Sequence, residues 1–84
     1  MIHELKTWIE YFELIMNGDK PFELRKNDRD FLTGQELLLR EYDKDKEEYT
    51  GRVLHRRITY VLGGIAGESF GLKEGYCIMG LERI

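Results

Sequence analysis

Hydrophobic residues recur at a helical period in the first part of the chain and at a period of two in the part that follows. From Thr7 to Asn17 apolar side chains recur at helical spacing with polar ones opposite, which predicts an amphipathic helix over about 8–17. Its apolar face holds Trp8, Ile9, Phe12, Ile15 and Met16. We expect Trp8 and Phe12 in the core, with the mouth of a cleft as the alternative place for Trp8 in the first turn. Thr7 and Glu10 fit a capping box, and Gly18 favours a helix end because glycine readily takes the left-handed conformation.

After this helix the period changes to two, which predicts strands. In the first of them Phe22 and Leu24 alternate with Glu23 and Arg25, so we expect the two apolar residues on a buried face. The expected strands are a short one at 2–6 and longer ones starting at 22 and spanning 36–42, 49–62 and 76–84.

Between these segments the chain is polar or rich in glycine. Residues 43–48 read as a solvated hairpin tip that Tyr42 and Tyr49 flank and pair across, and residues 63–75 as a loop with one helical turn at most. One helix and four or five strands, several joined by hairpins, predict an α+β, mostly β fold: a small barrel with the helix beside it. We expect one domain over 1–84.

Composition limits the cellular setting and the partners. The 84 residues carry a net charge of −3, whereas non-specific binders of nucleic-acid backbones are basic. This net charge does not exclude a local basic groove. The single cysteine, Cys77, forms no internal disulfide and fits a reducing compartment, and neither a signal peptide nor a membrane-spanning run is evident. We therefore expect a cytoplasmic protein without a membrane partner.

The strongest candidate for chemistry is the cluster of Lys20, Glu23 and Arg25. These groups suit an anionic or planar polar ligand, and a partly buried lysine also suits a general base. The competing interpretation is a strand whose exposed charges form weak surface ion pairs. A second candidate is Arg56, which lies in an otherwise apolar row and marks either the rim of a cleft or a shift of register.

Other sites lack support. The glycines at 63–71 match neither a P-loop nor a dinucleotide fingerprint, so a connection is the better interpretation, and Ser69 has no nearby histidine. The two histidines and Cys77 do not form a spaced metal motif, and Cys77 reads as a core residue. We expect no metal and no cofactor.

Four strings of residues carry a resemblance to a known family. Gly18 to Arg25 is similar to the pattern G-x-K-x-x-E-x-R of the activating signal cointegrator homology (ASCH) superfamily, which has a PUA-like fold. Residues 25–31, 40–43 and 49–52 resemble, within that group, a small bacterial and phage family without an assigned function. The likeness covers essentially the whole chain and implies a compact β-barrel with a helix beside a cleft.

The resemblance also implies a function, since ASCH proteins are generally regarded as RNA-binding. It places an RNA or nucleotide-like ligand in a cleft lined by Lys20, Glu23 and Arg25. A wider polar rim is formed by Asn27, Arg29 and Arg56.

Two alternatives remain. Some ASCH proteins hydrolyse N4-acetylcytidine with a lysine equivalent to Lys20, a threonine three residues on and a glutamate in a later helical insertion. Here Glu23 replaces the threonine and the 63–75 connection is short, so Lys20 is the one catalytic candidate and we expect binding rather than catalysis. The second alternative is a protein-interaction module or homodimer that uses an exposed strand edge.

Overall fold

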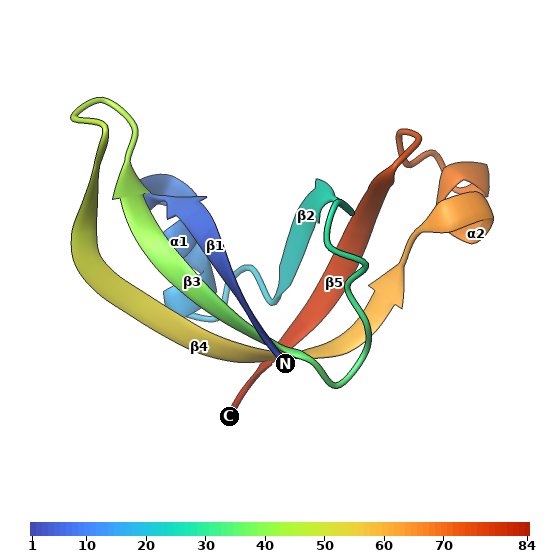
Figure 1. Cartoon of the computed structure of the whole chain (residues 1–84), viewed down its shortest axis with the longest axis horizontal. Helices are drawn as coiled ribbons and strands as arrows, with labels where there is room; N and C mark the ends of the chain where they lie inside the picture. Colours follow the sequence, from blue (N-terminus) through green and yellow to red (C-terminus); the bar gives the residue numbers. More distant parts are fainter.

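The computed structural model describes all residues, 1–84, and shows a strongly bent sheet with two short helices (Figure 1). In chain order the elements are β1 (Ile2–Trp8), α1 (Ile9–Met16), β2 (Phe22–Lys26), β3 (Glu36–Asp43), β4 (Glu48–Leu62), α2 (Gly64–Ser69) and β5 (Tyr76–Arg83). The expected α+β, mostly β composition is confirmed. Neither helix is long and apolar enough to cross a membrane.

One five-stranded sheet, in the order β1-β3-β4-β5-β2, makes up most of the molecule. β1 and β3 run parallel, while β3–β4, β4–β5 and β5–β2 are antiparallel. The edge strands β1 and β2 are not paired with each other, so the sheet bends into a half barrel rather than a closed one (Figure 1).

The core lies on the concave face of this sheet. Alternate residues of each strand point inward, and Ile15 of α1 and Phe31 of the β2–β3 loop pack onto them. The predicted inward row of Cys77, Met79 and Leu81 is confirmed. The remaining members of this core are Leu5, Leu37, Leu39 and Ile58.

The β3–β4 hairpin also follows its prediction. Tyr42 and Tyr49 are partners in register, with ring centroids 5.1 Å apart at an interplanar angle of 74°. The register shifts just beyond this pair, where Gly51 has φ +97°. A glycine tolerates this conformation best, which explains its place in the bulge.

The start of α1 differs from its prediction. β1 continues to Trp8, because its pairing with β3 extends as far as the partners Trp8 and Tyr42. Thr7 is thus a buried strand residue and not a helix cap, and the helix begins at Ile9 with no side-chain hydrogen bond at its cap. Trp8, predicted to lie in the core, is 44% exposed. Strand pairing outweighs the local capping motif.

The faces of β2 are the reverse of those predicted. Glu23 is 4% exposed, while Phe22 and Leu24 are 39% and 51% exposed. This strand therefore buries a carboxylate and leaves its apolar side chains in contact with solvent. The ion pairs that make this arrangement possible belong to the candidate site.

A second buried carboxylate, Glu41, joins α1 to the hairpin. Its oxygens accept hydrogen bonds from Arg52 at 2.9 and 2.7 Å and from the Thr50 hydroxyl at 2.6 Å. Arg52 also pairs with Glu13 of α1 at 2.7 Å and lies over the Phe12 ring. Hydrogen bonds from Arg52 lower the pKa of Glu41 below its ordinary value of 4.5, although burial opposes them.

A lowered pKa in the folded state makes Glu41 stabilising at neutral pH, and protonation at low pH removes that contribution. We expect Glu41→Gln to lower the free energy of unfolding by about 1.5–3 kcal/mol at pH 7. Below the ordinary pKa of 4.5 the difference from wild type should shrink. Urea unfolding followed across this pH range measures it.

The matched control is Glu13→Gln, since Glu13 touches the same Arg52 from an exposed position. It should cost less and keep the acid sensitivity of the wild-type protein. An equal loss of acid sensitivity in both variants would contradict the assignment to Glu41.

Candidate functional site

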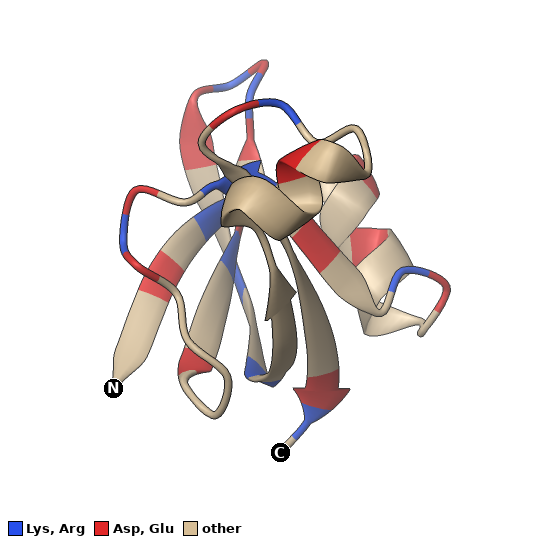
Figure 2. Cartoon of the chain, turned by 90° about the vertical axis from the view of Figure 1, so that its right-hand side faces the viewer, with Lys and Arg blue, Asp and Glu red and all other residues tan.

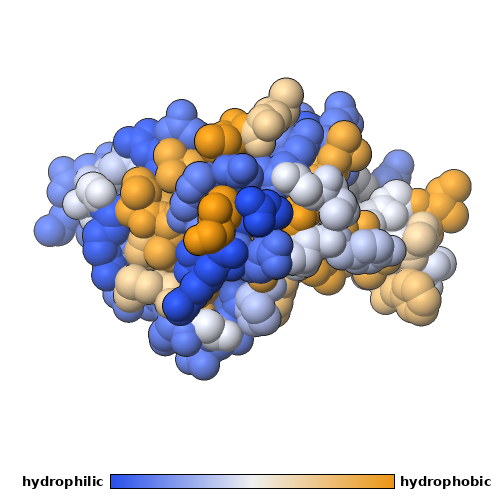
Figure 3. Space-filling view, turned by 90° about the horizontal axis from the view of Figure 1, so that it is seen from below, coloured by the Kyte–Doolittle hydropathy of each residue, from blue (hydrophilic) through white to orange (hydrophobic).

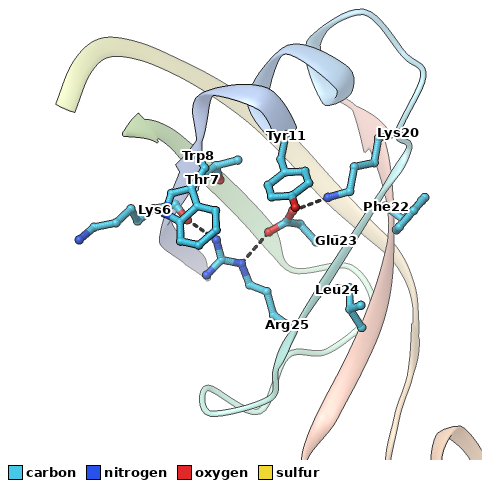
Figure 4. Close-up of a pocket in the computed structure, with 9 residues that line it drawn as sticks. All are labelled: Lys6, Thr7, Trp8, Tyr11, Lys20, Phe22, Glu23, Leu24 and Arg25. Carbon is cyan, nitrogen blue, oxygen red and sulfur yellow. Dashed lines mark hydrogen bonds and ion pairs between the residues drawn. The ribbon is translucent and has the colours of Figure 1, made fainter. Parts of the chain in front are cut away.

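The largest cavity, about 520 Å³, opens between the two unpaired edges of the sheet (Figure 4). One wall consists of the end of β1 and the first turn of α1, and the other wall is β2. Nine residues line it: Lys6, Thr7, Trp8, Tyr11, Lys20, Phe22, Glu23, Leu24 and Arg25. We call this cavity the cleft.

The turn after α1 positions Lys20 at the cleft. Gly18 has φ +88°, as predicted for a residue that ends the helix, and the Lys20 amide donates to the Leu14 carbonyl at 3.0 Å. The Pro21 carbonyl then accepts from the Leu81 amide at 3.0 Å, which attaches the chain to β5 and begins β2. The conformation of Gly18 and these two hydrogen bonds thus fix the backbone position of Lys20.

The buried carboxylate of Glu23 organises the cleft. One of its oxygens lies 3.3 Å from Lys20 Nζ, and the other accepts from Arg25 Nε at 2.6 Å. Burying an ion costs several kcal/mol unless it is paired and hydrogen-bonded, and here both oxygens have a cationic partner. The three groups carry a formal net charge of +1, on β2 and the loop that precedes it.

Arginine side chains connect the two edges. Arg25 Nη2 donates to the Lys6 carbonyl, and Arg29 Nη1 donates to the Glu4 carbonyl at 2.7 Å. Glu4 and Lys6 lie two positions apart, so their carbonyls face the same way along the free edge of β1. Arg25 therefore touches both walls of the cleft, the Glu23 carboxylate on one and the β1 backbone on the other.

Two aromatic rings form the outer part of the β1–α1 wall. Trp8 and Tyr11 are stacked with centroids 6.3 Å apart and an interplanar angle of 24°. Lys44 lies over the Trp8 ring and Lys20 over the Tyr11 ring, with Nζ at 4.4 and 4.9 Å from the centroids. Both residues are more than two-fifths exposed, so part of each ring is accessible to a ligand.

The structure brings together three of the six residues proposed from the sequence. Lys20, Glu23 and Arg25 converge in the cleft. Asn27 accepts from the Phe31 amide at 3.0 Å and shapes the β2–β3 loop, while Arg29 binds the β1 backbone. Arg56 lies elsewhere, in a smaller cavity at the other side of the α1–β2 loop.

Sequence reasoning missed part of the wall. Tyr11 lies in the first turn of α1, three positions after Trp8 at the end of β1, but its place outside the predicted apolar stripe hid its position at the cleft. The sequence predicts Thr7 as a helix cap, whereas in the structure it lines the cleft. Its hydroxyl is buried in the wall without a hydrogen-bond partner. Lys6 contributes its backbone, since its ammonium points away from the cleft toward the Tyr42 ring (Figure 4).

Charges elsewhere are mixed. On the side of the molecule seen in Figure 2, acidic and basic residues alternate along loops and strand ends and form no broad basic face. No cluster of three or more histidine, cysteine, aspartate or glutamate side chains is arranged to hold a metal ion. A ligand of the cleft would therefore meet local cations in an acidic protein.

Comparison with known proteins places the chain in a family. Residues 2–81 match the family described as "Domain of unknown function (DUF3850)", and the chain belongs to it. It is also similar to the "Uncharacterized 12.9 kDa protein in GpA 3'region" of Escherichia phage P2, with 42% identity over 60 residues. That match covers 71% of this chain and 53% of the phage protein, so it spans about half the length of this relative. The expected small bacterial and phage family is thereby supported.

The pairing of Glu23 makes Arg25 important for stability as well as for the cleft. Arg25→Ala leaves the carboxylate with Lys20 alone and releases the Lys6 carbonyl, so we expect a loss of about 2–3 kcal/mol in unfolding free energy. Arg57→Ala is the control, because its pair with Glu82 at 3.7 Å is exposed and should be worth less than about 1 kcal/mol. Equal losses in denaturant titrations would refute this role.

The unpartnered Thr7 hydroxyl predicts a stabilising substitution. A buried polar group without a hydrogen bond costs free energy, so Thr7→Val should raise the stability of the ligand-free protein by about 1 kcal/mol. Thr50→Val is the matched control, since the Thr50 hydroxyl donates to Glu41 and its removal should be destabilising. Thermal unfolding of both variants distinguishes the two hydroxyls, and a destabilised Thr7→Val would contradict the prediction.

Proposed function

We propose that this protein is an RNA-binding or nucleotide-binding module of the ASCH type with a PUA-like fold, and that its ligand occupies the cleft. The observation that carries the proposal is the convergence of Lys20, Arg25 and buried Glu23 beside an exposed pair of aromatic rings. The half-barrel sheet with a helix beside the cleft supports the same family assignment.

The aromatic wall suits a nucleobase. A base that stacks on Trp8 or Tyr11 contributes about 1–3 kcal/mol and needs no particular sequence, because every base has a π face. Exposed rings at the mouth of a cavity are well placed for this contact. Trp8 is also the single tryptophan of the chain, so its fluorescence reports on stacking directly.

The polar side of the cleft suits the charged or hydrogen-bonding part of a nucleotide. Lys20 offers a flexible ammonium, with its side chain 16% exposed, and the Arg25 guanidinium, at 27%, suits bidentate contacts. Glu23 holds both cations at the β2 wall. With so few cations, the footprint is short, a single nucleotide or a few residues of single-stranded RNA.

The contacts of Glu23 favour binding over hydrolysis. Its two oxygens are engaged by Lys20 and Arg25, so the carboxylate acts as a support for the cations. Lys20 is correspondingly held by an ion pair and lies beside the Tyr11 ring. These contacts fit a group that binds a ligand, and they set Glu23 apart from the threonine of the hydrolytic pattern.

A titration with short single-stranded RNA, followed by Trp8 fluorescence, tests the proposal. We expect saturable quenching, and Lys20→Ala should weaken binding about tenfold, which corresponds to one charge-assisted contact. Lys46→Ala, which removes the same charge from the hairpin turn, should leave the affinity within about twofold.

The salt dependence gives a second readout. Two phosphate contacts on a single strand predict a slope of about −1.4 for log K against log salt concentration. Absence of any binding, a slope several times steeper, or equal effects of Lys20→Ala and Lys46→Ala would each contradict the cleft as the binding site.

A further inference from the structure

A buried arginine without an acidic partner lies outside the cleft. Arg56 of β4 is 9% exposed, on the same face of the sheet as the core residues Leu37 and Ile58. Its guanidinium donates to the backbone carbonyl of His55 at 2.9 Å. No carboxylate oxygen lies within 4.0 Å of it, although every other buried charge of the chain is paired in that way.

A second arginine lies directly opposite. Arg83 of β5 is the register partner of Arg56, and the two side chains project from the same face of adjacent strands. Like charges at directly opposed positions destabilise a sheet. Arg83 donates to the Met16 carbonyl at 3.4 Å and has no carboxylate partner either. Burial, and then the charge of Arg83, lower the pKa of Arg56, consistent with a site that lacks negative charge.

A small cavity of about 120 Å³ opens between these arginines and the α1–β2 loop. Ile15, Pro21 and Leu81 form its apolar part. Glu82 also borders it, but this carboxylate pairs with Arg57 at 3.7 Å on the neighbouring strand. On the face seen from below, strongly hydrophilic residues lie among hydrophobic ones (Figure 3).

We propose that this cavity binds a phosphate-type oxyanion between Arg56 and Arg83. Its volume corresponds to about four water molecules, which suits a single phosphate group. Two guanidiniums on adjacent strands provide several N–H donors to one tetrahedral anion, and its negative charge removes the repulsion between them. The phosphate is either a free ion or one group of a polynucleotide chain.

The site is separate from the cleft. The α1–β2 loop divides the two cavities, with Lys20 on the cleft side and Gly18 and Pro21 on the arginine side. The proposal therefore does not depend on a ligand in the cleft. It requires only that the paired guanidiniums attract an anion of the right size.

Inorganic phosphate is the first probe. The Nε–Hε resonances of the arginines, followed by NMR at constant ionic strength with chloride as the reference, should shift saturably for Arg83 and Arg56. Arg83→Gln should weaken phosphate binding about tenfold or more, because it removes a charge-assisted contact from an exposed position that the fold tolerates. Lys46→Gln, with the same loss of charge in the β3–β4 turn outside the cavity lining, should leave binding within about twofold.

A short single-stranded RNA, tested with the same variants, distinguishes the two sources of phosphate. Weaker RNA binding by Arg83→Gln would assign the site to a polynucleotide phosphate, and unchanged RNA binding with lost phosphate binding would assign it to the free ion. The proposal is overturned if phosphate produces no saturable shift, or if Lys46→Gln weakens its binding as much as Arg83→Gln. Lys20→Ala leaves the phosphate shifts intact, so failure of the cleft proposal is recognised separately.

Discussion

The fold depends on the contacts that hold the two free edges of the sheet together and exclude water from the core. β1 and β2 meet across the cleft without backbone pairing, and arginines from β2 and its following loop bind the β1 carbonyls of Glu4 and Lys6 instead. Side chains thereby replace the hydrogen bonds that would complete a barrel. Because Arg25 also binds the buried Glu23 carboxylate, the closure of the sheet and the polarity of the cleft rest on one guanidinium.

A similar arrangement recurs at the β3–β4 hairpin. Arg52 joins the buried Glu41 carboxylate of the β3–β4 hairpin to Glu13 of α1, and it covers the Phe12 ring. In both places a carboxylate on the inner face of a strand recruits an arginine that reaches a different element. A small sheet with few core residues thus gains long-range connections from charged side chains, and Arg56 differs because no carboxylate accompanies it.

Much of the architecture was predictable, because hydrophobic period alone distinguishes the helix from the strands and marks the hairpin at Tyr42 and Tyr49. The failures share one cause. Thr7 fits a capping motif, but pairing with β3 carries the strand past it, and Phe22 and Leu24 look like a buried row until the ion pairs of Glu23 reverse the faces. Local rules cannot include partners that only the folded chain brings near. For the same reason the cluster of Lys20, Glu23 and Arg25 was visible in sequence while Tyr11 was not.

The position of Cys77 has a consequence for how the molecule moves. Its thiol is fully buried, on β5 directly opposite Arg25 of β2, and burial raises the pKa of the thiol, which suppresses the reactive thiolate. Because the chain has one cysteine, the rate of alkylation by a small reagent reports on opening of the core around this single side chain. The strand beside β2 therefore carries a built-in probe of core opening that needs no added label.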